Sequence, residues 1–201
     1  MFEHCRAFVI AANAVETRAL ELTAHSLGFG EVASRLGGSG ATLSRAVITY
    51  FFVDYRLADD ELLDVIDAVR EERSARLCYS PVILFTDDCP YSTMLKYVRF
   101  GFDDVVGLPQ SRDVLAERLA EQLDSELVYV EAKDYLGPDR RRLDSGAELR
   151  VGISSHTRVT FVRDARHGIR VLRREERGHR FRARPDPGTH FMPKLFGHRA
   201  V

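Results

Sequence analysis

The residues best able to do chemistry stand at the predicted ends of β-strands. Asp54 follows the apolar run 47–53, and Thr86 and Asp87 follow the run 81–85. Side chains at the carboxyl ends of parallel strands meet beyond one edge of the sheet, where ligands bind. A carboxylate there can pair with a cation or hold a metal ion through its oxygens. Taken singly, Asp54 is also explained as a carboxylate that caps a turn, and Thr86 as a β-branched strand residue.

The sequence holds no constellation typical of an enzyme. No third strand-end residue able to transfer a proton or attack a substrate stands beside Asp54, and no P-loop or G-x-S-x-G motif occurs. The cysteines at positions 5, 78 and 89 and the histidines are not at metal-ligand spacing. We therefore predict a protein that is not an enzyme, with no catalytic and no metal-ligating residues.

Alternating strand and helix segments before residue 130 must position these side chains. Short β-branched and aromatic runs indicate buried strands, and apolar residues at helical spacing indicate helices. This alternation implies a parallel sheet with right-handed crossovers and helices on both faces. We predict strands at 6–11, from 32, at 47–53, 81–86 and 104–106, and helices at 16–27, up to 45, from 59 or 60 to 69, at 90–100 and at 111–127.

Residues 5–127 resemble the receiver domain of two-component response regulators, the CheY-like family. Asp54 stands at the position of the family's phosphoacceptor aspartate, and Thr86 at that of its switch residue. In the segment GFDDVVGLP, Pro109 stands where the family has a proline after a lysine. The resemblance implies a (βα)5 flavodoxin-like α/β fold with a doubly wound parallel sheet. It also implies a role in bacterial two-component, phosphorelay-type signal transduction.

Departures from the family pattern concern the pocket around Asp54. Ala11 and Ala12 replace the family's acidic pair, Leu108 replaces its lysine, and Asp87 stands where the family has a small residue. Phosphoryl transfer to an aspartate needs a cation to neutralise the charge that develops on the phosphoryl oxygens. We therefore expect phosphorylation at Asp54 to be impaired or absent, and no cofactor, Mg²⁺ included. The domain is predicted to be a pseudo-receiver.

Two features of the same pocket leave open the alternative that Asp54 is phosphorylated with the help of other residues. Asp87 and Asp88 could donate replacement oxygens to Mg²⁺. Arg56, two residues beyond Asp54, could take the place of the missing lysine and pair with that carboxylate. The rim of the pocket is predicted to consist of Ala11, Ala12, Arg56, Asp87, Leu108 and Pro109.

A change of charge along the chain predicts two parts. The 201 residues hold 29 Lys+Arg and 30 Asp+Glu, yet acidic residues dominate up to about residue 132 and basic residues beyond it. We predict a receiver-like domain at 1–130 and an Arg-rich C-terminal extension at 131–201. A hydrophobic content of 45% excludes a mainly disordered chain. No membrane-spanning run and no secretory signal pattern is present, so we predict a cytoplasmic protein that does not bind membranes.

The basic extension is predicted to hold a small β-hairpin, in which 158–162 pairs with 169–172 across a turn at 166–168. Beyond Arg173 we expect a flexible, extended segment with spaced apolar residues, a pattern typical of a tail that docks on a surface. Arg140, Arg141 and Arg142 are candidate residues for binding an anion or a partner.

The resemblance, with its departures, implies an atypical response regulator, a pseudo-receiver without a standard output domain, that acts through protein–protein interaction. It also implies that the partners are signalling proteins, a second copy of the chain among them, bound through the surface of the fourth and fifth helices, which the family uses for such contacts. The alternative is a regulator that binds nucleic acid or a cyclic dinucleotide through the Arg-rich segment. No known nucleic-acid-binding motif supports that alternative.

Overall fold

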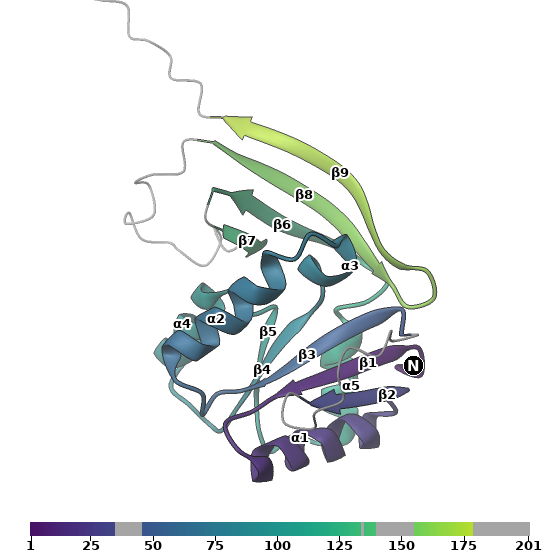
Figure 1. Cartoon of the computed structure of the whole chain (residues 1–201), viewed down its shortest axis with the longest axis vertical. Coiled ribbons are helices and arrows are strands. Elements are labelled where there is room, and N and C mark those ends of the chain that lie inside the picture. The colour runs from purple at the N-terminus through teal and green to yellow at the C-terminus, as the bar shows by residue number, and fades with distance from the viewer. Residues whose placement is uncertain (35–45, 134, 140–154, 179–201) are drawn as a thin grey trace, which may run out of the picture.

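Five strands form a parallel sheet in the first part of the chain (Figure 1). The computed structural model describes residues 1–34, 46–133, 135–139 and 155–178. The strands are β1 (Cys5–Ile10), β2 (Glu31–Ser34), β3 (Ile48–Asp54), β4 (Val82–Thr86) and β5 (Asp104–Gly107). All neighbours pair in parallel, in the order β2-β1-β3-β4-β5. Because this is the strand order of the flavodoxin-like fold, the predicted fold class is confirmed.

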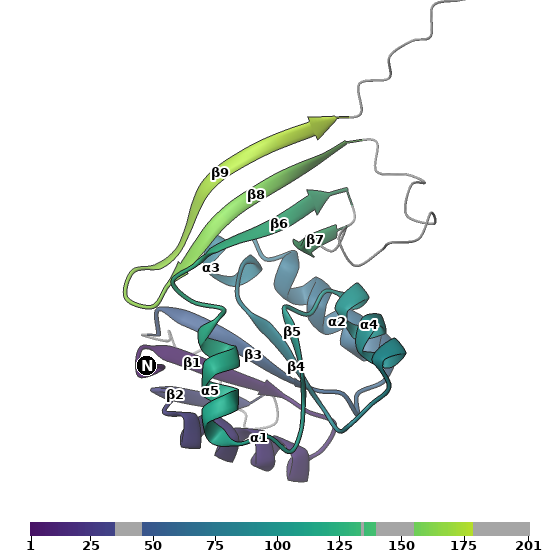
Figure 2. The same cartoon turned by 180° about the vertical axis from the view of Figure 1, so that it is seen from behind.

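The helices cover both faces of this sheet, as Figures 1 and 2 show. They are α1 (Ala14–Leu27), α2 (Asp59–Arg70), the single turn α3 (Ala75–Cys78), α4 (Tyr91–Phe100) and α5 (Arg112–Ala120). Asn13 begins α1, because its side chain accepts hydrogen bonds from the Val15 and Glu16 N–H groups. Gly28 ends α1 with a φ of 83°, which favours glycine.

Two apolar cores hold the helices to the sheet. On one face, α1 and α5 pack over aromatic side chains of β3 and β4, and the Tyr50 hydroxyl donates to the Leu119 carbonyl at 2.9 Å. On the other face, α2 and α4 pack over Val53 and Leu84. These cores fix the carboxyl ends of β1, β3 and β4 beside one another, so the residues that follow these strands share one edge of the sheet.

A second, antiparallel sheet follows the first. Its strands are β6 (Glu126–Ala132), β7 (Tyr135–Pro138), β8 (Ser155–Asp164) and β9 (Gly168–Gly178), in the order β7-β6-β8-β9. The predicted hairpin is confirmed as β8 and β9. Its turn is closed by the Asp164 carboxylate, which accepts from the Arg166 and His167 N–H groups. Gly168 then takes a φ of 88°.

Two predictions for this half of the chain are wrong. The helix predicted at 111–127 ends at Ala120, and Leu127 lies in β6, where it packs on the apolar cluster between the sheets. The leucine spacing suits a helix, but this tertiary contact and the pairing of β6 with its neighbouring strands make the segment a strand. The segment predicted to be flexible beyond Arg173 is still strand, because β9 pairs with β8 as far as Gly178. The predicted division between 130 and 131 falls within β6 and stays a prediction.

The antiparallel sheet packs on the amino-end side of the parallel strands, away from Asp54 (Figures 1 and 2). Arg163 on β8 carries this contact. Its buried guanidinium donates to the Tyr79 carbonyl, to the Gln122 side chain and to the Asp103 carboxylate, each at 2.7 Å. Tyr79 and Asp103 directly precede β4 and β5, so one side chain of the second sheet bonds to the start of two strands of the first.

Candidate functional site

Asp54 is buried at the carboxyl end of β3. The residue is only 3% exposed, and each of its two carboxylate oxygens accepts a backbone hydrogen bond. The Ala12 N–H donates to Oδ2 at 3.3 Å, and the Arg56 N–H donates to Oδ1 at 3.1 Å. The parallel pairing of Ile10 with Val53 places the residues after β1 beside Asp54. Ala12 and Asp54 therefore lie at one edge of the sheet.

The Arg56 guanidinium lies among three carboxylates at this edge. Nη1 is 3.4 Å from Oδ1 of Asp54 and 3.1 Å from Oε2 of Glu16, and Nη2 is 3.1 Å from Oδ2 of Asp87. The expected Arg56–Asp54 pair is present. Arg56 is only partly exposed, at 39% of its side chain. Desolvation by itself would lower the pKa of the guanidinium, but Glu16, Tyr55 and the two aspartates outweigh it and raise the pKa.

Tyr55 fixes the outer carboxylate of the cluster. Its hydroxyl donates a short hydrogen bond to Oδ2 of Asp87, the oxygen that also faces Arg56. This bond raises the pKa of the Tyr55 phenol, because it favours the protonated form. The Arg56 guanidinium lies over the Tyr55 ring, 4.8 Å from its centroid. Asp87 thus holds one carboxylate oxygen against both the phenol and the guanidinium, although its side chain remains exposed.

Thr86 ends β4 one residue before Asp87. It is 2% exposed, and its Oγ1 has no hydrogen-bond partner among the described residues. Its carbonyl accepts from the Leu108 N–H at 2.6 Å, which brings the predicted rim residues Leu108 and Pro109 to the same edge. The peptide bond between these two residues is cis. Leu108 packs on the apolar core and offers no charge to the site.

The residues present do not fit a Mg²⁺ ion. Mg²⁺ requires near-octahedral oxygen ligands, and Ala11 and Ala12 carry no side-chain oxygen. The Asp54 oxygens already accept hydrogen bonds, and Arg56 places a positive charge against the same carboxylate. Within the described ranges, no three carboxylate, histidine or cysteine side chains are grouped so that they could hold a metal.

Two residues of this cluster escaped the sequence analysis. Glu16 lies in the first turn of α1, and Tyr55 follows Asp54 directly. The available signal for Glu16 was its position, because a helix that follows β1 begins at the same sheet edge as Asp54. Asp88, considered as a replacement ligand, is exposed and makes no contact with Asp54 that the structure shows. Arg140, Arg141 and Arg142 lie outside the described residues, so the alternative of anion or nucleic-acid binding there stays a prediction.

Solved structures of receiver domains align with part of the chain. The chemotaxis protein CheY4 from Vibrio cholerae aligns with 58% of the chain and 97% of its own length, at 14% identity and a TM-score of 0.45. The receiver domain of a sensor histidine kinase from Pseudomonas aeruginosa, solved with a magnesium ion in its active-site cleft, aligns with 58% and 94%, at 19% identity and 0.45. A response regulator from Thermotoga maritima aligns with 58% and 94%, at 23% identity and 0.44.

Comparison of the amino-acid sequence with known proteins gives no match, since no protein-family model matches the chain and no curated protein matches it. Among the helices of the described segments, none combines the length and the apolar character needed to cross a bilayer.

Proposed function

We propose that the chain is an atypical response regulator, a pseudo-receiver that serves two-component-type signal transduction through protein–protein interaction. The observation that carries the proposal is the Arg56 guanidinium bound to Asp54, Glu16 and Asp87. A fixed organic cation then stands beside the phosphoacceptor-like aspartate in place of a dissociable metal ion. The pocket keeps one arrangement without a phosphoryl group.

The electrostatics of the cluster support this proposal. A metal ion that approached Asp54 would meet the positive charge of Arg56 and would have to break ion pairs to reach the carboxylate oxygens. A guanidinium can neutralise charge, but its planar N–H groups cannot supply the octahedral coordination that links aspartate and phosphodonor oxygens through Mg²⁺. Phosphorylation at Asp54 is therefore absent or strongly slowed, and Mg²⁺ is not a cofactor. In this proposal the domain acts by binding a partner and not by catalysis.

The partner surface that we propose is formed by α4 and α5. Tyr91 at the start of α4 is 72% exposed, and Val114 on α5 is also exposed. Exposed aromatic and apolar side chains beside charged neighbours are typical of transient protein contacts. The occupants that we propose are signalling proteins of the cytoplasm, a second copy of this chain among them. The antiparallel sheet leaves this surface uncovered, because it packs at the amino ends of the strands (Figure 2).

Incubation with a small acyl phosphate and Mg²⁺, followed by intact mass measurement, tests the proposal. We expect the mass of the full chain to stay unchanged under conditions in which a standard receiver domain is labelled. A stable phosphoryl adduct on the wild type that is lost in Asp54→Asn would contradict the pseudo-receiver proposal. An Asp67→Asn variant, which changes an exposed carboxylate of α2 away from the site, serves as a control for unspecific labelling of carboxylates.

A further inference from the structure

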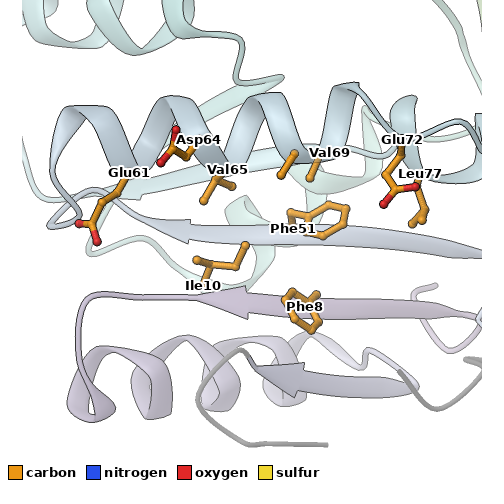
Figure 3. Close-up of a pocket in the computed structure, with 10 residues that line it drawn as sticks. Phe8, Ile10, Phe51, Glu61, Asp64, Val65, Val69, Glu72 and Leu77 are labelled. Carbon is orange, nitrogen blue, oxygen red and sulfur yellow. The ribbon is translucent and has the colours of Figure 1, made fainter. Parts of the chain in front are cut away.

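An open groove lies between α2 and the parallel sheet, on the face opposite α1 and α5 (Figure 3). It has a volume of about 530 Å³. Phe8 and Ile10 of β1 and Phe51 of β3 form its floor, and Val65 and Val69 of α2 form its wall. The Phe8 and Phe51 rings are half-buried and meet edge to face, with centroids 5.9 Å apart. The floor therefore presents aromatic surface that a further apolar side chain can cover.

Three carboxylates border this apolar floor. Glu61 and Glu72 lie at opposite ends of the groove and Asp64 lies between them on α2 (Figure 3). The Glu61 carboxylate accepts the Ala58 N–H, which fixes it at the start of α2. Neither Asp64 nor Glu72 has an ion-pair partner among the described residues, and both are exposed. An occupant that combines aromatic or aliphatic side chains with positive charges would match both the floor and the rim.

The chain itself carries a segment of this composition. Residues 179–201 lie outside the described residues and contain a single acidic residue, Asp186. Their basic residues are Arg180, Arg182, Arg184, Lys194 and Arg199. Their large apolar residues are Phe181, Phe191, Met192, Leu195 and Phe196. Sequence and groove are thus complementary in charge and in apolar character.

The segment begins close enough to reach the groove. On β9, Arg174 donates to the Tyr79 hydroxyl at 3.0 Å, and Leu77, two residues before Tyr79, lines the groove. Gly178, the last described residue, ends the same strand shortly after Arg174. At about 3.3 Å per residue, the segment beyond Gly178 spans on the order of 70 Å when extended. Length therefore does not limit access to any part of the groove.

We propose that residues 179–201 dock in this groove of their own chain, with aromatic side chains over Phe8 and Phe51 and basic side chains beside Asp64 and Glu72. This proposal goes beyond the function proposed above and does not depend on the cation at Asp54. It makes the groove an internal docking surface whose occupant is the C-terminal segment of the same chain.

A photo-crosslinking amino acid at position 68 of the full chain tests the docking. Ala68 lines the groove and is exposed, so a bulky probe fits there without entering the core. We expect covalent capture of a peptide from 179–201 within a single chain. The same probe at Asp67, which is exposed on α2 but does not line the groove, is expected to give no such product. Capture of residues 35–45, capture of a second copy, or no capture at all would overturn the proposal.

Charge variants separate docking from chance proximity. The double substitution Asp64→Asn/Glu72→Gln should lower the yield of the captured segment severalfold, and added salt should lower it in the wild type. The matched double substitution Asp67→Asn/Glu71→Gln removes the same charge from exposed positions outside the groove, on α2 and directly after it, and should leave the yield unchanged. Equal yields in all three proteins would contradict a charge-matched docking. The phosphodonor test is unaffected by either pair, so the two proposals fail independently.

Discussion

Arg163 on β8 donates through Nη2 to Oδ1 of Asp103 at 2.7 Å, and both side chains are buried, at 0% and 3% exposed. Arg70 of α2 binds the other Asp103 oxygen, also at 2.7 Å, and the Tyr129 hydroxyl of β6 donates to the first. One carboxylate from the parallel part thus joins Arg70 of α2 to Arg163 and Tyr129 of the antiparallel sheet. We infer that the two sheets unfold together, because breaking their contact would leave buried charges unpaired.

Loss of the Asp103 charge tests this coupling. Asp103→Asn leaves Arg70 and Arg163 buried without a counter-charge, and a broken buried pair typically costs about 3–5 kcal/mol of unfolding free energy. The neighbouring Asp104→Asn removes a more exposed pair with Arg118 and should cost at most about 1 kcal/mol. Urea unfolding of both variants measures the difference. Similar, small losses in the two variants would show that the buried cluster does not hold the sheets together.

Acid titration should reveal the same carboxylate. Desolvation by itself would raise the pKa of Asp103, but Arg163 and Arg70 outweigh it and lower the pKa below the ordinary 3.8. A carboxyl whose pKa is lowered in the folded state stabilises the fold fully above its unfolded pKa. That contribution is lost as the pH falls through the lower, folded pKa. We expect the unfolding free energy of the wild type to decrease below about pH 4 more steeply than that of Asp103→Asn. The same decrease of unfolding free energy with falling pH in the two proteins would contradict a lowered pKa at Asp103.

Thr86→Val tests the buried hydroxyl at the end of β4. The Thr86 Oγ1 has no partner in the described part of the chain, so the substitution removes a buried polar group and breaks no hydrogen bond. Burial of an unpaired hydroxyl costs about 1–3 kcal/mol in mutational data. We therefore expect the variant to be as stable as the wild type or more stable, in thermal or urea unfolding. A loss of more than about 1 kcal/mol would show that the hydroxyl is hydrogen-bonded.

The cysteines should differ in reactivity. Burial raises the pKa of the Cys5 thiol to about 11, and burial also raises that of Cys78. Cys89 is only partly buried. Since the thiolate is the nucleophile, a maleimide reagent should label Cys89 first and the other two only after denaturation. Peptide mass mapping after brief labelling measures the order. Early labelling of Cys5 would mean that β1 opens readily at the amino end of the sheet.

The parallel sheet was predictable because its strands are short apolar runs that end at recognisable residues. The run from Val47 to Val53 and the residues before Thr86 have the short, β-branched and apolar character of buried strands. The sheet edge was predictable for the same reason, and Asp54, Ala12 and Arg56 lie together there. The contacts of Glu16 and Tyr55 with this cluster were not predictable, because they depend on side-chain directions across different elements.

The second sheet was only partly predictable. The β8–β9 hairpin had a turn signal at Gly168. Strand β6 could not be predicted, because the leucine spacing in this region also suits a helix. What decides between the two is the burial of Tyr129 and Phe161 against Tyr79, a contact between distant parts of the chain. The buried arginine at 163 had no sequence signal, since its partners come from four separate segments.

Binding of Mn²⁺, as a spectroscopic substitute for Mg²⁺, to the full chain and to Arg56→Ala tests the central claim most directly. Removal of the guanidinium leaves Asp54, Glu16 and Asp87 without their shared counter-charge. We predict that Arg56→Ala binds Mn²⁺ at least tenfold more tightly than the wild type, a difference of about 1.4 kcal/mol. Arg18→Ala removes an exposed arginine of α1 that does not contact Asp54, and it should bind Mn²⁺ as weakly as the wild type does. Tight Mn²⁺ binding by the wild type, unchanged in Arg56→Ala, would contradict the account.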